Sequence, residues 1–238
     1  SLAYSPGVAV PCEEIYIDDK KVYDYTSKGN MVAVITDGTA VLGLGDIGVH
    51  ASLPVMEGKC LLFKKFAGLD AFPILVDSKD PDLFIQTVYL ISKSFGGINL
   101  EDVSSPRCVT IERKLIEICD VPVFHDDQHG TAIVTLAAVI NAMRLLKRDI
   151  SKQKIVICGV GAAGNSIARL LHDYGAKTIY GYNSSGIISK SNYDKYNFVI
   201  QELLDENIIT SFELPNDNTL SDLVKDTDIF IGVSVKDI

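Results

Sequence analysis

Two carboxylates and two histidines stand within five consecutive residues, His125-Asp126-Asp127-Gln128-His129. A short apolar run precedes them, and an apolar stretch that predicts a helix follows. Because charged groups between two apolar elements lose hydration, these side chains need a partner, and a divalent cation is the simplest one. The alternative is a helix N-terminus, where aspartate is favoured as a cap and by the helix dipole. One aspartate fits a cap, whereas two aspartates with two histidines favour a metal site.

A second pair of adjacent carboxylates, Glu101 and Asp102, follows the double glycine Gly96-Gly97 by a few residues. Neighbouring side chains diverge on a regular strand or helix, so both could bind one ion only from a bend. Taken alone, such a pair is typical of solvated surface. Together with Asp126 and Asp127 it offers enough oxygen ligands for Mg²⁺ or Mn²⁺, with room for a substrate.

Lys59 lies inside the apolar stretch from Pro54 to Leu62. A buried lysine near a metal is expected to have a lowered pKa, which suits a general base. The alternative is a surface lysine whose methylene stem covers apolar surface. Tyr4, near the start of the chain, is by composition alone only an anchored aromatic residue.

The glycine motif Gly159-Val160-Gly161-Ala162-Ala163-Gly164 follows an apolar strand and opens an amphipathic helix. This context predicts a dinucleotide-binding turn, in which the first glycine permits the turn, the second lets backbone approach pyrophosphate, and the third allows close packing. The helix N-terminus then offers N–H groups to the phosphates. Asn183 stands where an acidic residue usually binds the ribose of NAD, so the choice between NAD and NADP stays open.

Apolar runs bounded by turns alternate with helical patterns, which is typical of an α/β fold. The predicted strands span residues 31–35, 41–44, 72–76, 121–124, 155–158, 178–182 and 228–231. The predicted helices span residues 53–66, 82–95, 110–118, 132–146, 163–174 and 193–204. We place a domain boundary at Gln128. Residues 1–128 are then an N-terminal α/β substrate and metal domain, and residues 129–238 a Rossmann-type dinucleotide-binding domain, with the helix from Ala132 as connector.

Composition narrows the class of protein. The 238 residues are 47% hydrophobic and carry a formal net charge of −9, with no run of basic residues longer than Lys64-Lys65, which disfavours nucleic acid as a partner. No apolar run reaches the ~18–20 residues of a membrane span, and no signal peptide is recognisable. Five cysteines without a C-x-x-C pair predict buried free thiols in a reducing compartment, so we expect a cytoplasmic protein.

Along nearly all of its length the chain resembles the short, bacterial-type malic enzymes. Six motifs in the same order carry the likeness: Tyr4-Ser5-Pro6-Gly7-Val8-Ala9, Thr36-Asp37-Gly38-Thr39-Ala40-Val41-Leu42-Gly43-Leu44-Gly45, Val55-Met56-Glu57-Gly58-Lys59, Phe66-Ala67-Gly68-Leu69-Asp70-Ala71-Phe72-Pro73, Gly96-Gly97-Ile98-Asn99-Leu100-Glu101-Asp102 and Phe124–Thr131. The resemblance implies oxidative decarboxylation of (S)-malate to pyruvate and CO₂ with NAD or NADP, dependent on Mg²⁺ or Mn²⁺.

Residue by residue, the resemblance assigns metal binding to Glu101, Asp102 and Asp127. Both histidines then either support the ligands without touching the metal or are structural. The resemblance assigns the general base to Lys59, with Asp126 in support, and the general acid to Tyr4. It implies a homodimer or higher homo-oligomer, and leaves open whether Lys59 and Tyr4 act within one subunit. The implied cofactor contacts come from Gly159, Gly161, Ala162, Ala163, Gly164, Asn183, Val233 and Ser234.

The sequence departs from the family pattern in two respects. It reaches Ile238 before the family's later Asn-Pro segment, so we expect part of a longer enzyme with an incomplete nucleotide-binding domain. Ala40 stands where the larger eukaryotic-type enzymes carry a substrate-binding arginine, which leaves the residue that binds the substrate carboxylate open. Two rival interpretations also stay open: a malolactic enzyme that converts malate to lactate, and a catalytically incomplete nucleotide-binding remnant.

Overall fold

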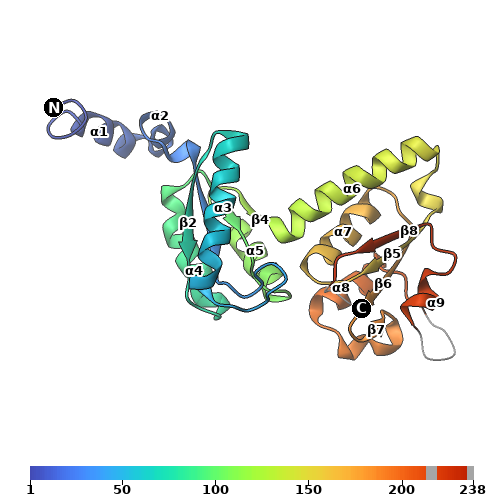
Figure 1. Ribbon diagram of the computed structural model, residues 1–238. Coiled ribbons are helices and arrows are strands. Elements are labelled where there is room, and N and C mark those ends of the chain that lie inside the picture. The colour runs from blue at the N-terminus through green and yellow to red at the C-terminus, as the bar shows by residue number, and fades with distance from the viewer. Residues whose placement is uncertain (213–218, 235–238) are drawn as a thin grey trace.

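In the computed structural model, which describes residues 1–212 and 219–234, two four-stranded sheets are joined by one long helix, α6 (Figure 1). The first sheet has the strand order β2-β1-β3-β4, and all its strands are parallel. Its strands are β1 (Met31–Thr36), β2 (Asp70–Leu75), β3 (Gly97–Leu100) and β4 (Val123–His125). Leu100 pairs with Ile35 on one side and with His125 on the other, so the residues that follow β3 and β4 meet at one edge of the sheet.

Three helices cover the first sheet: α3 (Val49–Ala67), α4 (Pro81–Ile91) and α5 (Arg107–Ile118). Phe84 of α4 and Leu115 of α5 are fully buried against Ile35 and Leu100 of the sheet. Helix α3 lies against β1 and β2. Asn99, between two residues of the α4–α5 core, therefore has its side chain on the face that α3 partly covers.

The N-terminal helices α1 (Ala9–Ile17) and α2 (Val22–Tyr25) stand away from this body (Figure 1). Neither helix contains a buried residue, and several of their apolar side chains are exposed. The 3-10 turns of the described chain span Asp19–Lys21, Lys28–Asn30, Ser92–Ser94, Ile150–Lys152 and Lys190–Lys195.

The second sheet has the order β7-β6-β5-β8, with only the short β7 antiparallel to its neighbour. Its strands are β5 (Lys154–Cys158), β6 (Thr178–Asn183), β7 (Gly186–Ile187) and β8 (Ile229–Gly232). The helices of this half are α7 (Ala162–Asp173), α8 (Phe198–Asp205) and α9 (Leu220–Val224). Strand β5, the glycine turn, α7 and the parallel strand β6 form the βαβ unit that the glycine motif predicts.

Helix α6 (Asp126–Leu146) begins directly after β4 and packs along α7. By length and composition, with a mean hydropathy of 1.4 in its most apolar window, it is the one described helix that could cross a membrane. The uncharged stretch inside it, residues 128–143, is still shorter than a continuous apolar span, and such a helix alone is weak support for one. The boundary proposed at Gln128 falls inside the first turn of α6 and stays a prediction.

The structure corrects several predicted elements. Residues 41–44 form a turn rather than a strand, because Leu42 has a φ of 49° and Gly45 a φ of 77°, which reverse the chain. The helix expected from Ala132 begins at Asp126. Strands β3 and β7 and helices α1, α2 and α9 were not predicted. Of the five cysteines, all free, only Cys108 and Cys158 are buried.

Candidate active site

Three carboxylates meet where the chain leaves β3 and β4. One oxygen of each of Glu101, Asp102 and Asp127 lies within 4.8 Å of the others. Asp102 occupies a bend with a φ of 54°, the conformation that lets two neighbouring carboxylates turn to one point. The backbone N–H of Asp102 donates a hydrogen bond of 2.9 Å to Asp127 Oδ2, which connects the two segments directly.

The donor set fits a divalent cation. Burial raises the pKa of Glu101 to about 7, although the hydrogen bond from Asn99 opposes the shift. Burial and the charge of Asp127 raise the pKa of Asp102 to about 6, and Asp102 Oδ2 is buried without a hydrogen-bond partner among the described residues. An all-oxygen cluster of this kind suits Mg²⁺ or Mn²⁺ rather than zinc.

Metal binding is expected to stabilise the protein more at pH 7.5 than at pH 5. The raised pKa values mean that the folded state favours protonated Glu101 and Asp102, a stabilisation that is lost as the pH rises through about 6 to 7. A bound cation requires the ionised forms, so the increase in Tm on adding Mn²⁺ should grow over that interval. Thermal unfolding with and without Mn²⁺ at both pH values measures it. The prediction is contradicted if Mn²⁺ raises Tm equally at both pH values. It is also contradicted if Mn²⁺ raises the Tm of Glu101→Gln as much as that of the parental protein.

Lys59 reaches this cluster from the middle of α3. Its Nζ lies 2.7 Å from Asp126 Oδ2 and 3.1 Å from Glu101 Oε1. Burial lowers the pKa of Lys59, but the hydrogen bond with Asp126 and the charges of Glu101 and Asp126 outweigh burial and raise it above the usual value. This direction applies to the protein without a metal, in which the lysine is ion-paired as well as buried, so the lowered pKa expected beside a metal stays a prediction.

A cavity of about 340 Å³ opens beside Lys59 and Asp126, on the face of the first sheet that α3 partly covers. Phe63, Asn99 and Phe124 also line it. The space is sufficient for a small organic acid beside Lys59 and Asp126, although Glu101, Asp102 and Asp127 do not line it.

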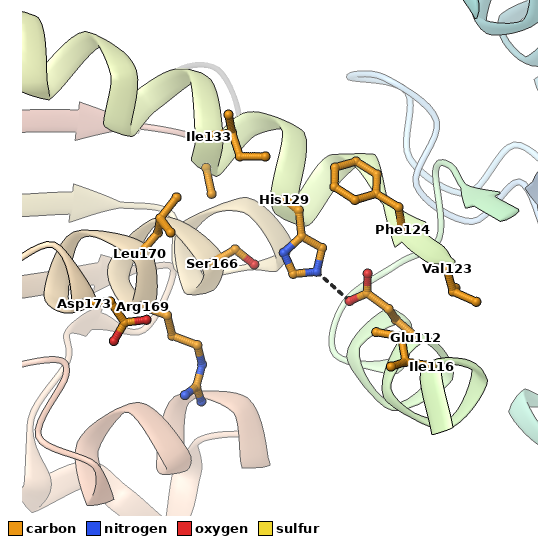
Figure 2. A pocket seen from close by; sticks show the side chains of 11 residues that line it. Glu112, Ile116, Val123, Phe124, His129, Ile133, Ser166, Arg169, Leu170 and Asp173 are labelled. Carbon is orange, nitrogen blue, oxygen red and sulfur yellow. Dashed lines mark hydrogen bonds and ion pairs between the residues drawn. The ribbon is translucent and has the colours of Figure 1, made fainter. Parts of the chain in front are cut away.

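The two histidines of the 125–129 segment take no part in the carboxylate cluster itself. His125 is fully buried, its Nε2 lies 3.3 Å from Asp127 Oδ2, and burial lowers its pKa. His129 Nε2 hydrogen-bonds Glu112 Oε2 at 2.8 Å, which raises the His129 pKa. Figure 2 shows this pair at the edge of a cavity of about 510 Å³, with Ser166 and Arg169 of α7 on the other side.

The glycine turn has the geometry expected for a dinucleotide. Gly159 has a φ of 98°, and a Cβ there would lie 2.7 Å from the carbonyl oxygen of Val233 and 2.8 Å from the backbone nitrogen of Ser234. A Cβ on Gly164 would lie 1.9 Å from the carbonyl oxygen of Gly159. Gly161, by contrast, faces open space, as close approach of a ligand to backbone requires.

The other residues proposed for cofactor contact lie around this turn. Ala162 and Ala163 form the first turn of α7, whose N-cap is Gly161. Asn183 ends β6, and its Oδ1 accepts a hydrogen bond of 2.8 Å from the backbone of Ser185.

Tyr4 is the one proposed catalytic residue that the described chain leaves apart from the cluster. It lies in the turn before α1, 76% exposed, on the segment that stands away from the body (Figure 1).

Three residues that shape the site were not predicted from the sequence. Asn99 Nδ2 donates a hydrogen bond of 2.9 Å to Glu101 Oε2, and the strand period of two carries both side chains to the same face. Glu112 is only 4% exposed on the apolar face of α5. Gly130 leaves room for Asp126, since a Cβ there would lie 2.2 Å from Asp126 Oδ1. Two of these residues left a signal in the sequence: Glu112 is a charged residue at a core position of a helix, and Gly130 is a glycine inside a helix.

Comparison with known proteins identifies both halves of the chain. Residues 1–116 match the family model "Malic enzyme, N-terminal domain", and residues 128–236 match "Malic enzyme, NAD binding domain". The chain is 53% identical over 237 residues to the bifunctional malic/malolactic enzyme of Bacillus subtilis, covering 99% of this chain and 56% of that protein. It is 49% identical to an NAD-dependent malic enzyme of Geobacillus stearothermophilus, covering 98% and 48%.

A solved structure gives the same result for the fold. The NAD-dependent malic enzyme of Thermotoga maritima superposes with a TM-score of 0.91 at 43% identity, covering 98% of this chain and 61% of that chain. The chain thus spans about half the length of the curated relatives it matches.

Proposed function

The chain belongs to the malic enzyme family, and from this premise we propose that it carries the site for oxidative decarboxylation of (S)-malate to pyruvate and CO₂, with reduction of NAD⁺ or NADP⁺. The observation that carries the proposal is the approach of Glu101, Asp102 and Asp127 to within 4.8 Å, beside a lysine paired with Asp126. These groups come from separate segments of the chain, and each has the chemistry that the reaction requires.

Glu101, Asp102 and Asp127 would hold the metal ion. A bound Mg²⁺ or Mn²⁺ would supply positive charge beside the reacting oxygens of malate, and the same charge would offset the carboxylates that raise the Lys59 pKa. Lys59 then removes the proton of the malate C2 hydroxyl, while the hydrogen bond to Asp126 orients its amine. Tyr4 donates a proton to C3 after CO₂ has left. Residues 1–128 bind substrate and metal, and residues 129–238 bind the nucleotide.

We propose that Tyr4 acts together with a second copy of the chain. Tyr4 is exposed on a segment whose helices α1 and α2 bury none of their residues. Exposed apolar side chains gather there, Leu2, Tyr4, Val10, Tyr16 and Ile17 among them. Such a segment is typical of an interface, so we propose a homodimer or higher homo-oligomer in which Tyr4 completes the site of its partner.

Mixing two inactive variants is expected to restore activity. If Tyr4 and Lys59 act across subunits, a dimer of one Tyr4→Phe and one Lys59→Ala chain contains one intact site and one doubly altered site. Random exchange of equal amounts should then give about a quarter of the parental activity. The measurement is NAD(P)H formation after subunit exchange. Recovery no greater than the sum of the two separate variants would mean that both residues act within one chain.

The direct test is a coupled absorbance assay of the full-length protein with malate and Mn²⁺, comparing NAD⁺ with NADP⁺. Asn183, which replaces the usual acidic residue, leaves both nucleotides as candidates. We propose a soluble, cytoplasmic protein whose substrate is malate and which binds neither nucleic acid nor membrane. Omission of Mn²⁺ or of malate should abolish NAD(P)H formation.

A second function, conversion of malate to lactate with retention of the nucleotide, is favoured by the name of the Bacillus subtilis relative, a bifunctional malic/malolactic enzyme. Both reactions need the same carboxylates and lysine. Quantifying pyruvate and lactate alongside NAD(P)H distinguishes them: lactate without net NAD(P)H supports the second function, and pyruvate equal to NAD(P)H supports the first. If neither product forms, the catalytically incomplete remnant becomes the better interpretation.

A further inference from the structure

Glu112 is a buried glutamate on α5 that accepts three hydrogen bonds from the start of α6. Its Oε1 accepts from the backbone N–H of His125 at 2.8 Å, and its Oε2 accepts from Gln128 Nε2 at 3.0 Å. The ring of His129 hydrogen-bonds the same Oε2 at 2.8 Å, as Figure 2 shows. The side chain of Glu112 is only 5% exposed, so these contacts satisfy a carboxylate that has little access to water.

The three donors flank the two aspartates that face the carboxylate cluster. His125 precedes Asp126 and Asp127, while Gln128 and His129 follow them. The N-cap residue of α6, His125, makes no capping hydrogen bond with its side chain, so the helix start lacks its usual local anchor. Glu112 supplies that anchor from a different helix, one that belongs to the core of the first sheet.

The side chain of Asp127 has few contacts of its own to hold it in place. It accepts one hydrogen bond, from the backbone of Asp102, and its oxygen lies near the ring of His125. Its side chain is 37% exposed, so packing alone does not fix it. The placement of Asp127 beside Glu101 and Asp102 therefore depends on where the first turn of α6 sits.

We propose that Glu112 is a positioning residue of the metal site, which keeps the first turn of α6 in the place where Asp127 meets Glu101 and Asp102. This inference rests on the proposed metal-dependent function. Groups that orient metal ligands from behind typically change metal affinity by about 10–100-fold when they are removed. Glu112 contributes through hydrogen bonds to the segment that carries the ligand and does not touch the ion.

The test is the affinity for Mn²⁺, measured by electron paramagnetic resonance in the absence of malate. Glu112→Gln keeps the size of the side chain but has one acceptor oxygen in place of two. It therefore cannot accept hydrogen bonds both from the backbone of His125 and from the side chains of Gln128 and His129. We expect the Mn²⁺ dissociation constant to rise about tenfold or more, with that of NAD⁺ or NADP⁺ unchanged. Glu117→Gln is the matched control, since Glu117 lies on the same helix with its side chain 68% exposed. It should leave both constants unchanged.

Two further variants keep the outcome decisive. His129→Leu removes one donor at a half-exposed position and should raise the Mn²⁺ constant several-fold even if Glu112→Gln does not fold. Asp127→Asn should weaken Mn²⁺ binding in any case. If only Asp127→Asn does so, the role of Glu112 is wrong and the metal site stands. If Asp127→Asn has no effect, the metal site is wrong, and the role of Glu112 falls with it. Equal weakening of nucleotide binding in Glu112→Gln would mean general loosening and overturn the proposal.

Discussion

Replacing Lys59 with alanine is expected to lower kcat for malate oxidation by about 10²–10⁴-fold, the usual contribution of a general base. Lys59 is the cation paired with both Asp126 and Glu101, and it lines the cavity of about 340 Å³ together with Asp126. The same change removes the positive charge that Lys59 places beside Glu101. Mn²⁺ no longer competes with that charge for the carboxylate, so it should bind at least as tightly as before. Steady-state kinetics together with the Mn²⁺ dissociation constant separate these two effects.

Lys65→Ala is the matched control for this prediction. Lys65 lies on the same helix as Lys59, with its side chain exposed, and should give parental kcat. Adding a small primary amine to the Lys59→Ala protein should restore part of the rate, because the missing group is then supplied from solution. Ordinary malate turnover by Lys59→Ala would refute its assignment as the base.

Replacing Asp127 with asparagine is expected to raise the Mn²⁺ dissociation constant by about 100-fold or more, since a charged ligand becomes a neutral one. Asp127 also accepts the backbone hydrogen bond from Asp102, which an amide oxygen can keep. The fold of the segment should therefore survive while the charge is lost. Titration with Mn²⁺ measures the affinity, and thermal unfolding without metal checks that Tm is retained.

Asp120→Asn makes the same chemical change at a surface position. Asp120 is 60% exposed and pairs with Lys93, away from the carboxylate cluster. It should leave Mn²⁺ affinity and kcat unchanged. Parental affinity in Asp127→Asn would contradict the proposed ligand set.

The regular parts of the fold were predictable because their signals are local. Strand β5, the glycine turn and α7 lie within a few residues of the expected bounds, since an apolar strand, three spaced glycines and an amphipathic helix follow one another directly. The segment 41–44 shows where local pattern fails. It is apolar, yet Leu42 and Leu44 are 71% and 69% exposed, because the turn projects them away from the sheet.

Strand β3 shows the converse error: it is a strand whose sequence lacks the usual strand pattern. Gly96 and Gly97 directly follow the predicted helix 82–95 and have no side chains to show a strand pattern, and Asn99 interrupts the apolar pattern that a buried strand normally has. Its polarity has a cause that only the structure reveals, the hydrogen bond to Glu101. A residue that serves a site breaks the pattern by which its element would be recognised.

The ligand types of the site were predictable, but their meeting was not. The oxygen-rich composition of the two carboxylate pairs indicated a hard cation, whereas the contact between Lys59 and Asp126 joins residues 67 positions apart. That contact depends on the strand order β2-β1-β3-β4, which no spacing in the sequence specifies. Asp126 and Asp127 lie in the first turn of α6. They can therefore both stabilise the start of a helix and take part in a metal site, so the two interpretations of this segment are compatible.

The continuity of α6 limits how this protein could be recombined with its relatives. The helix begins with Asp126 and Asp127 and then packs along α7 of the nucleotide-binding half. A chimera that takes a new nucleotide-binding half, for instance to change cofactor preference, must therefore be joined inside this helix, beyond the contacts of Glu112 with His129. The junction has to conserve the number of residues, because each one added or deleted would turn the transplanted half by about 100° relative to the metal ligands.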